Sequence, residues 1–302
     1  MREKVVSFGP ANTLAGVVTE PAPDVAVAGA PTAIILNAGI VHRVGPFRLH
    51  VWLARRLAEA GFSTLRLDLS GLGESAVRPG KMHAHDRALL DVDEAMKYLA
   101  KSRGAKDFVL AGLCSGAFNA HRASVKDDRV KGAVFIDGIA FRTLGFYFHS
   151  YFLRAFKPRQ IRNAIMRRVR GQMHEEGSAL GGKLAEQEFF GEGLAKDKTQ
   201  RELSKLLDRG VRMLFLYTDG CDDVSHRLQF REMYGFSPDE GQLQVEYHSR
   251  AEHTLRLLEN RTTVVDRIAE WYTQQFGATE SAVGSAQSSQ QLVLDSAAPT
   301  NN

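Results

Sequence analysis

The stretch Gly112-Leu-Cys-Ser-Gly116 constrains the fold of this 302-residue chain more than any other. It follows an apolar run, residues 108–113, that is typical of a buried strand, and it precedes residues 115–125, whose pattern predicts a helix. Glycines on both sides of Cys114 let a strand and a helix pass closely without a Cβ clash. The stretch therefore predicts a sharp strand-to-helix turn with the Cys114 side chain at its apex.

Short apolar runs alternate with amphipathic segments along the rest of the chain. Apolar positions at spacings of three and four predict helices over residues 49–60, 84–102 and 264–271. We expect eight strands, at residues 4–8, 14–18, 32–37, 63–69, 108–113, 130–136, 211–217 and 243–247. This alternation predicts an α/β fold, with a mostly parallel eight-stranded sheet and helices on both faces.

Two segments interrupt the alternation of strands and helices. Residues 140–207 contain no convincing strand and predict a helical cap, inserted into an α/β core formed by residues 1–139 and 208–276. Residues 277–302 are rich in Ser, Gln and Ala and nearly free of aromatic residues. Such a composition cannot bury enough apolar surface to fold, so we expect a disordered tail.

The composition argues against several classes of protein. No run reaches the ~18 apolar residues of a spanning helix, so we expect no membrane span. The N-terminus lacks the apolar block of a secretory signal, which indicates a cytoplasmic protein. Two cysteines, Cys114 and Cys221, are too few for a disulfide framework. No CxxC or HExxH spacing is present, so we expect no metal and no cofactor.

A thiol at the predicted turn has an evident chemical use. The following helix would point its positive end at Cys114, and a neighbouring histidine would increase the thiolate fraction. A thiolate attacks acyl carbon readily, so acyl transfer from esters or thioesters suits it. The same turn could also hold a small, buried and inert cysteine. The turn alone leaves both interpretations open.

Two further segments carry a resemblance to a known family. Asp68-Leu-Ser-Gly-Leu-Gly-Glu-Ser75 resembles the D-x-x-G-x-G-x-S loop after the fourth strand of α/β-hydrolases. Arg250-Ala-Glu-His253-Thr254 resembles the loop that carries their catalytic histidine. The chain is also similar to hydrolases associated with bacterial exosortase and exopolysaccharide gene clusters, in the segments GIVHRVGP, RLDLSGLGES and GLCSGA. The resemblance covers residues 32–276 without the cap, and it implies an α/β-hydrolase fold.

The resemblance also implies site residues, in the order nucleophile, acid, histidine. Cys114 would be the nucleophile and His253 the base, with His248 as the nearest alternative to His253. The oxyanion hole would use two backbone N–H groups, those of Ser115 and Ile40. The Ile40 assignment rests on a loop that has Ala-Gly where many relatives have His-Gly.

The acid would follow the strand at residues 211–217. Gly220-Cys-Asp-Asp223 fits the G-x-x-D pattern that many family members have there, so Asp223 is the predicted acid. Carboxylates are common in turns, and two further candidates lie in the same loop, Asp222 and Asp219.

The predicted cap is unusually basic. Residues 142–170 hold seven arginines and one lysine but no Asp or Glu, with aromatic residues interleaved. The aromatic side chains could line an acyl pocket, and the arginines could bind phosphates of coenzyme A or of an acyl carrier protein. A cap with a basic outer face is the plainer interpretation. No nucleic-acid-binding motif accompanies the charge, so we expect no nucleic-acid partner.

These observations predict an acyl hydrolase of thioesterase or esterase type that acts on a small-molecule acyl substrate. A Cys-His-Asp triad, Cys114, His253 and Asp223, would work through an acyl-enzyme. Two alternatives stay open. An acyltransferase of a biosynthetic cluster could use the same acyl-cysteine, and a non-catalytic binding protein could keep Cys114 buried.

Overall fold

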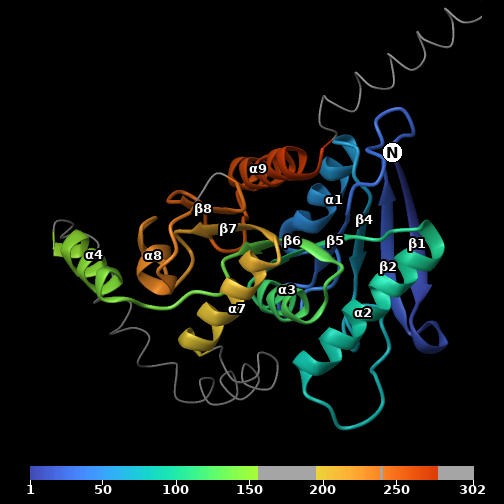
Figure 1. The fold of residues 1–302 in the computed structure, drawn as a ribbon, viewed down its shortest axis with the longest axis horizontal. Coiled ribbons are helices and arrows are strands. Elements are labelled where there is room, and N and C mark those ends of the chain that lie inside the picture. The colour runs from blue at the N-terminus through green and yellow to red at the C-terminus, as the bar shows by residue number, and fades with distance from the viewer. Residues whose placement is uncertain (156–194, 239–240, 278–302) are drawn as a thin grey trace, which may run out of the picture.

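The computed structural model describes residues 1–155, 195–238 and 241–277. Their eight strands form one sheet in the order β1-β2-β4-β3-β5-β6-β7-β8 (Figure 1). The edge strand β1 (Arg2–Phe8) and the strand beside it, β2 (Leu14–Glu20), are antiparallel to their neighbours. The other six strands are parallel: β3 (Thr32–Leu36), β4 (Thr64–Leu67), β5 (Phe108–Leu113), β6 (Val130–Ile136), β7 (Arg212–Thr218) and β8 (Leu243–His248). The expected mostly parallel eight-stranded sheet is confirmed.

Helices cover both faces of the sheet (Figure 1). One face carries α1 (Leu49–Glu59) and α9 (Leu258–Phe276), which share a core cluster with the sheet. The other face carries α2 (Ala84–Arg103), α3 (Ser115–Lys126), α7 (Lys196–Asp208) and the short α8 (Gln229–Tyr234). Every residue of β3 and β5 is buried, because helices shield both sides of these central strands.

The structure differs from the predicted cap boundaries at one point. Leu203 and Leu206 of α7 are buried in the same cluster as α3, so the packed core resumes near Lys196 and not at residue 208. Near the start of the predicted cap, α4 (Leu144–Ala155) contacts α8. Most of the predicted cap, residues 156–194 with most of its arginines, lies outside the described residues, as does the predicted tail from residue 278 onwards. No described helix is both long and apolar enough to span a bilayer.

The six parallel strands end at one edge of the sheet, and the loops that follow them meet there. Open α/β sheets place their ligand sites at this edge. The loops after the strands carry Asn37 (after β3), Asp68 (after β4), Cys114 (after β5), Asp137 (after β6), Asp219 (after β7) and His253 (after β8).

Candidate active site

Cys114 occupies a strained turn between β5 and α3. Its backbone has φ 56° and ψ −116°, a region that residues other than glycine rarely adopt. A Cβ on Gly112 would lie 2.2 Å from the carbonyl carbon of Gly116. A Cβ on Gly116 would lie 2.7 Å from the backbone carbonyl oxygen of Asn37. Both glycines are therefore required by close backbone packing. The turn presents a half-buried Cys114 side chain at the C-terminal edge of the sheet.

His253 lies between Cys114 and a carboxylate. Its Nδ1 donates a hydrogen bond to Oδ2 of Asp137 at 3.0 Å, and the Cys114 side chain lies close enough to affect the pKa of the ring. Because Nδ1 is occupied by Asp137, Nε2 is the ring nitrogen left for the sulfur. The imidazole is 37% exposed, whereas the Asp137 side chain is fully buried. The imidazole is thus accessible to solvent, whereas its carboxylate partner is shielded from water.

The surroundings of His253 favour its charged form. The hydrogen bond to Asp137, then the hydrogen bond to Cys114, raise the pKa of His253 to about 10, together with the negative charge of both partners. Burial opposes this rise in the pKa but does not cancel it. An imidazole with this pKa is an imidazolium at neutral pH.

Asp137 is held in place by the neighbouring strand β7. Its carboxylate accepts hydrogen bonds from the backbone N–H and the hydroxyl of Thr218, at 2.6 and 2.5 Å. The backbone of Asp137 has φ 44°, which turns the chain sharply after β6. A Cβ on Gly138 would lie 2.4 Å from the Ala117 side chain, so this turn packs directly against α3. Two strands and one helix therefore fix the acid.

The predicted acid, Asp223, does not reach His253. Its Oδ1 accepts a hydrogen bond from Nε of Arg142 at 2.9 Å, and both side chains of this ion pair are about half exposed. Asp219, an alternative, accepts a hydrogen bond from the Tyr247 hydroxyl. The structure brings Asp137 to the histidine because the chain turns at the end of β6, one strand earlier than the family pattern indicates. An aspartate directly after an apolar strand and before a glycine was the sequence signal for it.

The loop after β3 lies beside the turn of Cys114. The backbone N–H of Gly39 donates a 2.6 Å hydrogen bond to Oγ of Ser115, the residue after the nucleophile. This bond occupies the Gly39 amide and the Ser115 hydroxyl. Within the described chain, the backbone N–H groups of Ile40 and Ser115 have no hydrogen-bond acceptor. These are the two groups that the sequence assigned to the oxyanion hole.

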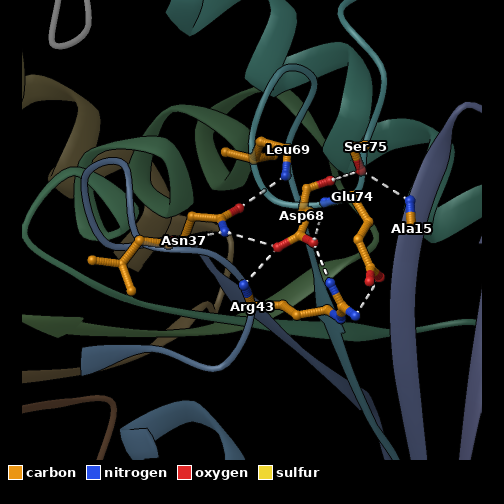
Figure 2. Close-up of polar contacts among 8 residues, drawn as sticks. Ala15, Asn37, Arg43, Asp68, Leu69, Glu74 and Ser75 are labelled. Atoms are coloured by element: carbon orange, nitrogen blue, oxygen red, sulfur yellow. Dashed lines mark hydrogen bonds and ion pairs between the residues drawn. The ribbon is translucent and has the colours of Figure 1, made fainter. Parts of the chain in front are cut away.

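A buried polar network connects the same loop to the loop after β4 (Figure 2). Asn37 donates to the Val41 carbonyl at 3.0 Å and accepts from the Leu69 N–H at 2.9 Å. The fully buried carboxylate of Asp68 accepts the backbone N–H of Arg43 at 2.6 Å and also pairs with the Arg43 guanidinium. The D-x-x-G-x-G-x-S segment is thus a structural clamp on the loop after β3.

The loop after β7 supports His253 through its backbone. A Cβ on Gly220 would lie 2.2 Å from the His253 backbone nitrogen, so this position accepts glycine alone without displacing the base. The glycine of the predicted G-x-x-D pattern therefore packs against the His253 backbone, whereas its aspartate makes no hydrogen bond with the His253 side chain.

Two other candidates stand apart from the nucleophile. Burial raises the pKa of the Cys221 thiol to about 12, which keeps this sulfur protonated and unreactive. His248 lies 3.3 Å from a carboxylate oxygen of Glu246, on the strand β8 itself. Among the described residues, no group of three or more His, Cys, Asp or Glu side chains could hold a metal ion.

Comparison with known proteins finds hydrolases that share this fold. The family model for serine aminopeptidases, S33, matches residues 32–166. The structure is similar to an α/β serine hydrolase without lid from Xanthomonas campestris, with TM-score 0.55, 16% identity, and coverage of 92% of this chain and 96% of that one. It is also similar to an esterase from Pyrococcus furiosus, with TM-score 0.57, 15% identity, and coverage of 91% of this chain and 92% of that one. A proline iminopeptidase from Mycobacterium smegmatis has TM-score 0.55 and 14% identity, with coverage of 90% of this chain and 98% of that one.

These likenesses confirm the expected α/β-hydrolase fold. No curated protein sequence matches the chain. The matched family and the Xanthomonas structure are named for serine, whereas this chain has Cys114 between the two glycines of the turn and a serine, Ser115, one position later.

Proposed function

We propose that this chain, which has the α/β-hydrolase fold, hydrolyses acyl esters or thioesters through an acyl-enzyme on Cys114. The observation that carries this proposal is the placement of His253, which hydrogen-bonds to Asp137 and whose pKa is raised in part by the nearby Cys114 side chain. Nucleophile, base and orienting acid within hydrogen-bond reach are the arrangement of a catalytic triad.

The raised pKa of His253 favours a sulfur nucleophile over an oxygen one. An imidazolium cannot take a proton from an alcohol, but it can hold a thiolate as an ion pair. With a pKa of about 10, His253 is charged at neutral pH. Ser115 is a poor alternative nucleophile, because its hydroxyl already accepts the Gly39 N–H and lies against the loop after β3.

In the proposed reaction, the Cys114 thiolate attacks the acyl carbon, and the N–H groups of Ser115 and Ile40 bind the oxyanion that forms. Losing one such donor typically costs roughly 3–4 kcal/mol of transition-state stabilisation. His253 gives its proton to the departing alcohol or thiol, and Asp137 orients the ring. Water, deprotonated by the now neutral His253, then attacks the thioester, which releases the acid and restores the Cys114 thiolate beside the protonated His253.

A pair of cysteine variants tests this proposal. Cys114→Ala should lose at least roughly a thousandfold in kcat/KM on a panel of aryl esters and acyl thioesters, because the acyl-enzyme cannot form. Cys221→Ala is the matched control and should retain wild-type activity, because its thiol is buried and protonated. Intact-mass measurement should find an acyl adduct on the wild type and on Cys221→Ala. Equal turnover by Cys114→Ala would contradict the proposal.

The same reactions separate hydrolysis from acyl transfer. Product analysis with and without an added amine, alcohol or thiol acceptor shows whether water is the preferred second nucleophile. An acyl donor held on coenzyme A or on an acyl carrier protein is included in the panel, because the basic residues 142–170 motivated that class of partner.

A further inference from the structure

A cavity of about 200 Å³ adjoins the turn of Cys114. Gly39 and Ser115, beside and within the proposed oxyanion hole, line one part of it, and Asn119 lines it one helical turn further along α3. The rest of its wall comes from Asn37, from α2 and from the loop after β4. Neither Cys114 nor His253 lines this cavity. It therefore lies on the oxyanion side of the nucleophile.

The position of the cavity decides which part of a substrate it can hold. The leaving group must stay within hydrogen-bond reach of His253, which gives it a proton. The acyl substituent has to extend from the carbonyl carbon in another direction. A cavity that touches Gly39 and Ser115 but not His253 suits the acyl substituent. Resting on the proposed function, we infer that this cavity selects short acyl groups that end in a carboxylate, such as succinyl or glutaryl.

The size of the cavity limits the acyl chain. A cavity of about 150 Å³ binds a benzene-sized ligand of six carbons, so about 200 Å³ accommodates a group slightly larger than that. The part of a succinyl or glutaryl group beyond the reacting carbonyl has five or six. A fatty-acyl chain of ten carbons exceeds this volume.

The polar side chains of the wall favour an anion. Asp91 is neutralised, because it accepts hydrogen bonds from the backbone and hydroxyl of Ser70 and pairs with Arg78 at 2.7 Å. Arg87 donates one N–H to the Met82 carbonyl and has no acidic partner among the described residues. The cavity therefore carries a net positive charge.

Asn119 adds a neutral donor to this charge. Its amide makes no hydrogen bond with another described residue, so its N–H groups are available to a ligand. A guanidinium and an amide in one small cavity bind a carboxylate better than a methyl group.

Kinetics on acyl esters with one common leaving group test this inference, using acetyl, butyryl, succinyl and decanoyl esters. Wild type should cleave the succinyl ester at least about tenfold better than the butyryl ester in kcat/KM. Arg87→Met should remove that preference by lowering the succinyl rate more than the butyryl rate. Asn119→Ala should reduce the succinyl rate by a smaller factor. Lys101→Met removes a charge from the exposed far end of the same helix, α2, and should preserve the preference.

A second variant tests the volume independently of charge. Ala84→Leu, at the wall of the cavity and at the start of α2, should slow the succinyl and butyryl esters while sparing the acetyl ester. Failure of wild type to cleave the acetyl ester would reject the proposed function itself. Cleavage of the acetyl ester with equal rates on succinyl and butyryl esters, or a preference for the decanoyl ester, would overturn this inference alone.

Discussion

The charge of His253 is the residue-level property on which the proposed chemistry depends. The hydrogen bond to Asp137, followed by the interaction with Cys114, raises the pKa of the ring to about 10. In the proposed reaction, a ring with this pKa can give a proton to the leaving group. The identity of the nucleophile and the protonation state of its partner are consistent with each other.

Replacing Asp137 should change both the rate and its pH dependence. Asp137→Asn removes the carboxylate that raises the pKa of His253, so the alkaline limb of kcat/KM should move from about pH 10 toward the ordinary histidine value near 6.5. At neutral pH, kcat should fall by at least roughly a hundredfold. pH–rate profiles on one thioester measure both effects.

Asp223→Asn provides the matched control for this change. It removes a half-exposed ion pair with Arg142 and should leave the profile as in wild type. A profile that responds to Asp223→Asn, and not to Asp137→Asn, would restore the sequence-based assignment of the acid.

At the level of elements, the loop after β3 is held at three points. Asn37 ties it to the loop after β4, Asp68 pairs with Arg43, and Ser115 ties Gly39 to the start of α3. Only the third tie connects the loop to the turn that carries the nucleophile. Ser115 is thus a positioning residue for the proposed oxyanion hole.

Ser115→Ala should lower kcat with little effect on folding. It keeps its backbone N–H but loses the hydrogen bond to Gly39, so we expect roughly a tenfold fall in kcat, a smaller change in KM, and a nearly unchanged melting temperature. Ser124→Ala, in the same helix, loses a hydrogen bond to the Ala120 carbonyl far from the site. That control should leave kcat intact, and a Ser115→Ala enzyme with wild-type kcat would contradict the positioning role.

The sequence predicted the elements better than the contacts between their loops. Apolar runs and helical spacings are local, so β5, α3 and β6 appear within a residue or two of their expected bounds. The pairing of an acid with a histidine depends on two turns more than a hundred residues apart. The glycine of the G-x-x-D pattern supports His253 by backbone packing, which a pattern of side chains does not reveal.

At the scale of the whole molecule, the link between Asp137 and His253 spans three neighbouring strands. Asp137 follows β6 and His253 follows β8, while Thr218 at the end of β7 donates to the same carboxylate. These hydrogen bonds therefore connect the ends of β6, β7 and β8 to one another at the C-terminal edge of the sheet. Its charge state should contribute to the stability of the fold.

The stability contribution of His253 should depend on pH in a defined direction. Its pKa is raised from 6.5 to about 10 in the folded chain, so its contribution is complete below about pH 6.5 and is lost as the pH rises through about 10. The difference in unfolding free energy between wild type and His253→Gln should be largest near pH 6 and smallest above about pH 10. Urea denaturation at both pH values measures it. A difference that grows with rising pH would contradict the assignment of the charge.

The loop after β7 does not supply the carboxylate that hydrogen-bonds to His253, because that carboxylate is Asp137, after β6. Asp223 of this loop instead forms an ion pair with Arg142, which precedes α4 at the start of the basic segment 142–170. Substitutions of Asp223 leave the His253 imidazole its carboxylate partner, because Asp137 follows another strand. Gly220 is the exception, because any side chain at that position would push against the histidine backbone. Selection for new substrates could therefore act on this loop with little cost to the chemistry.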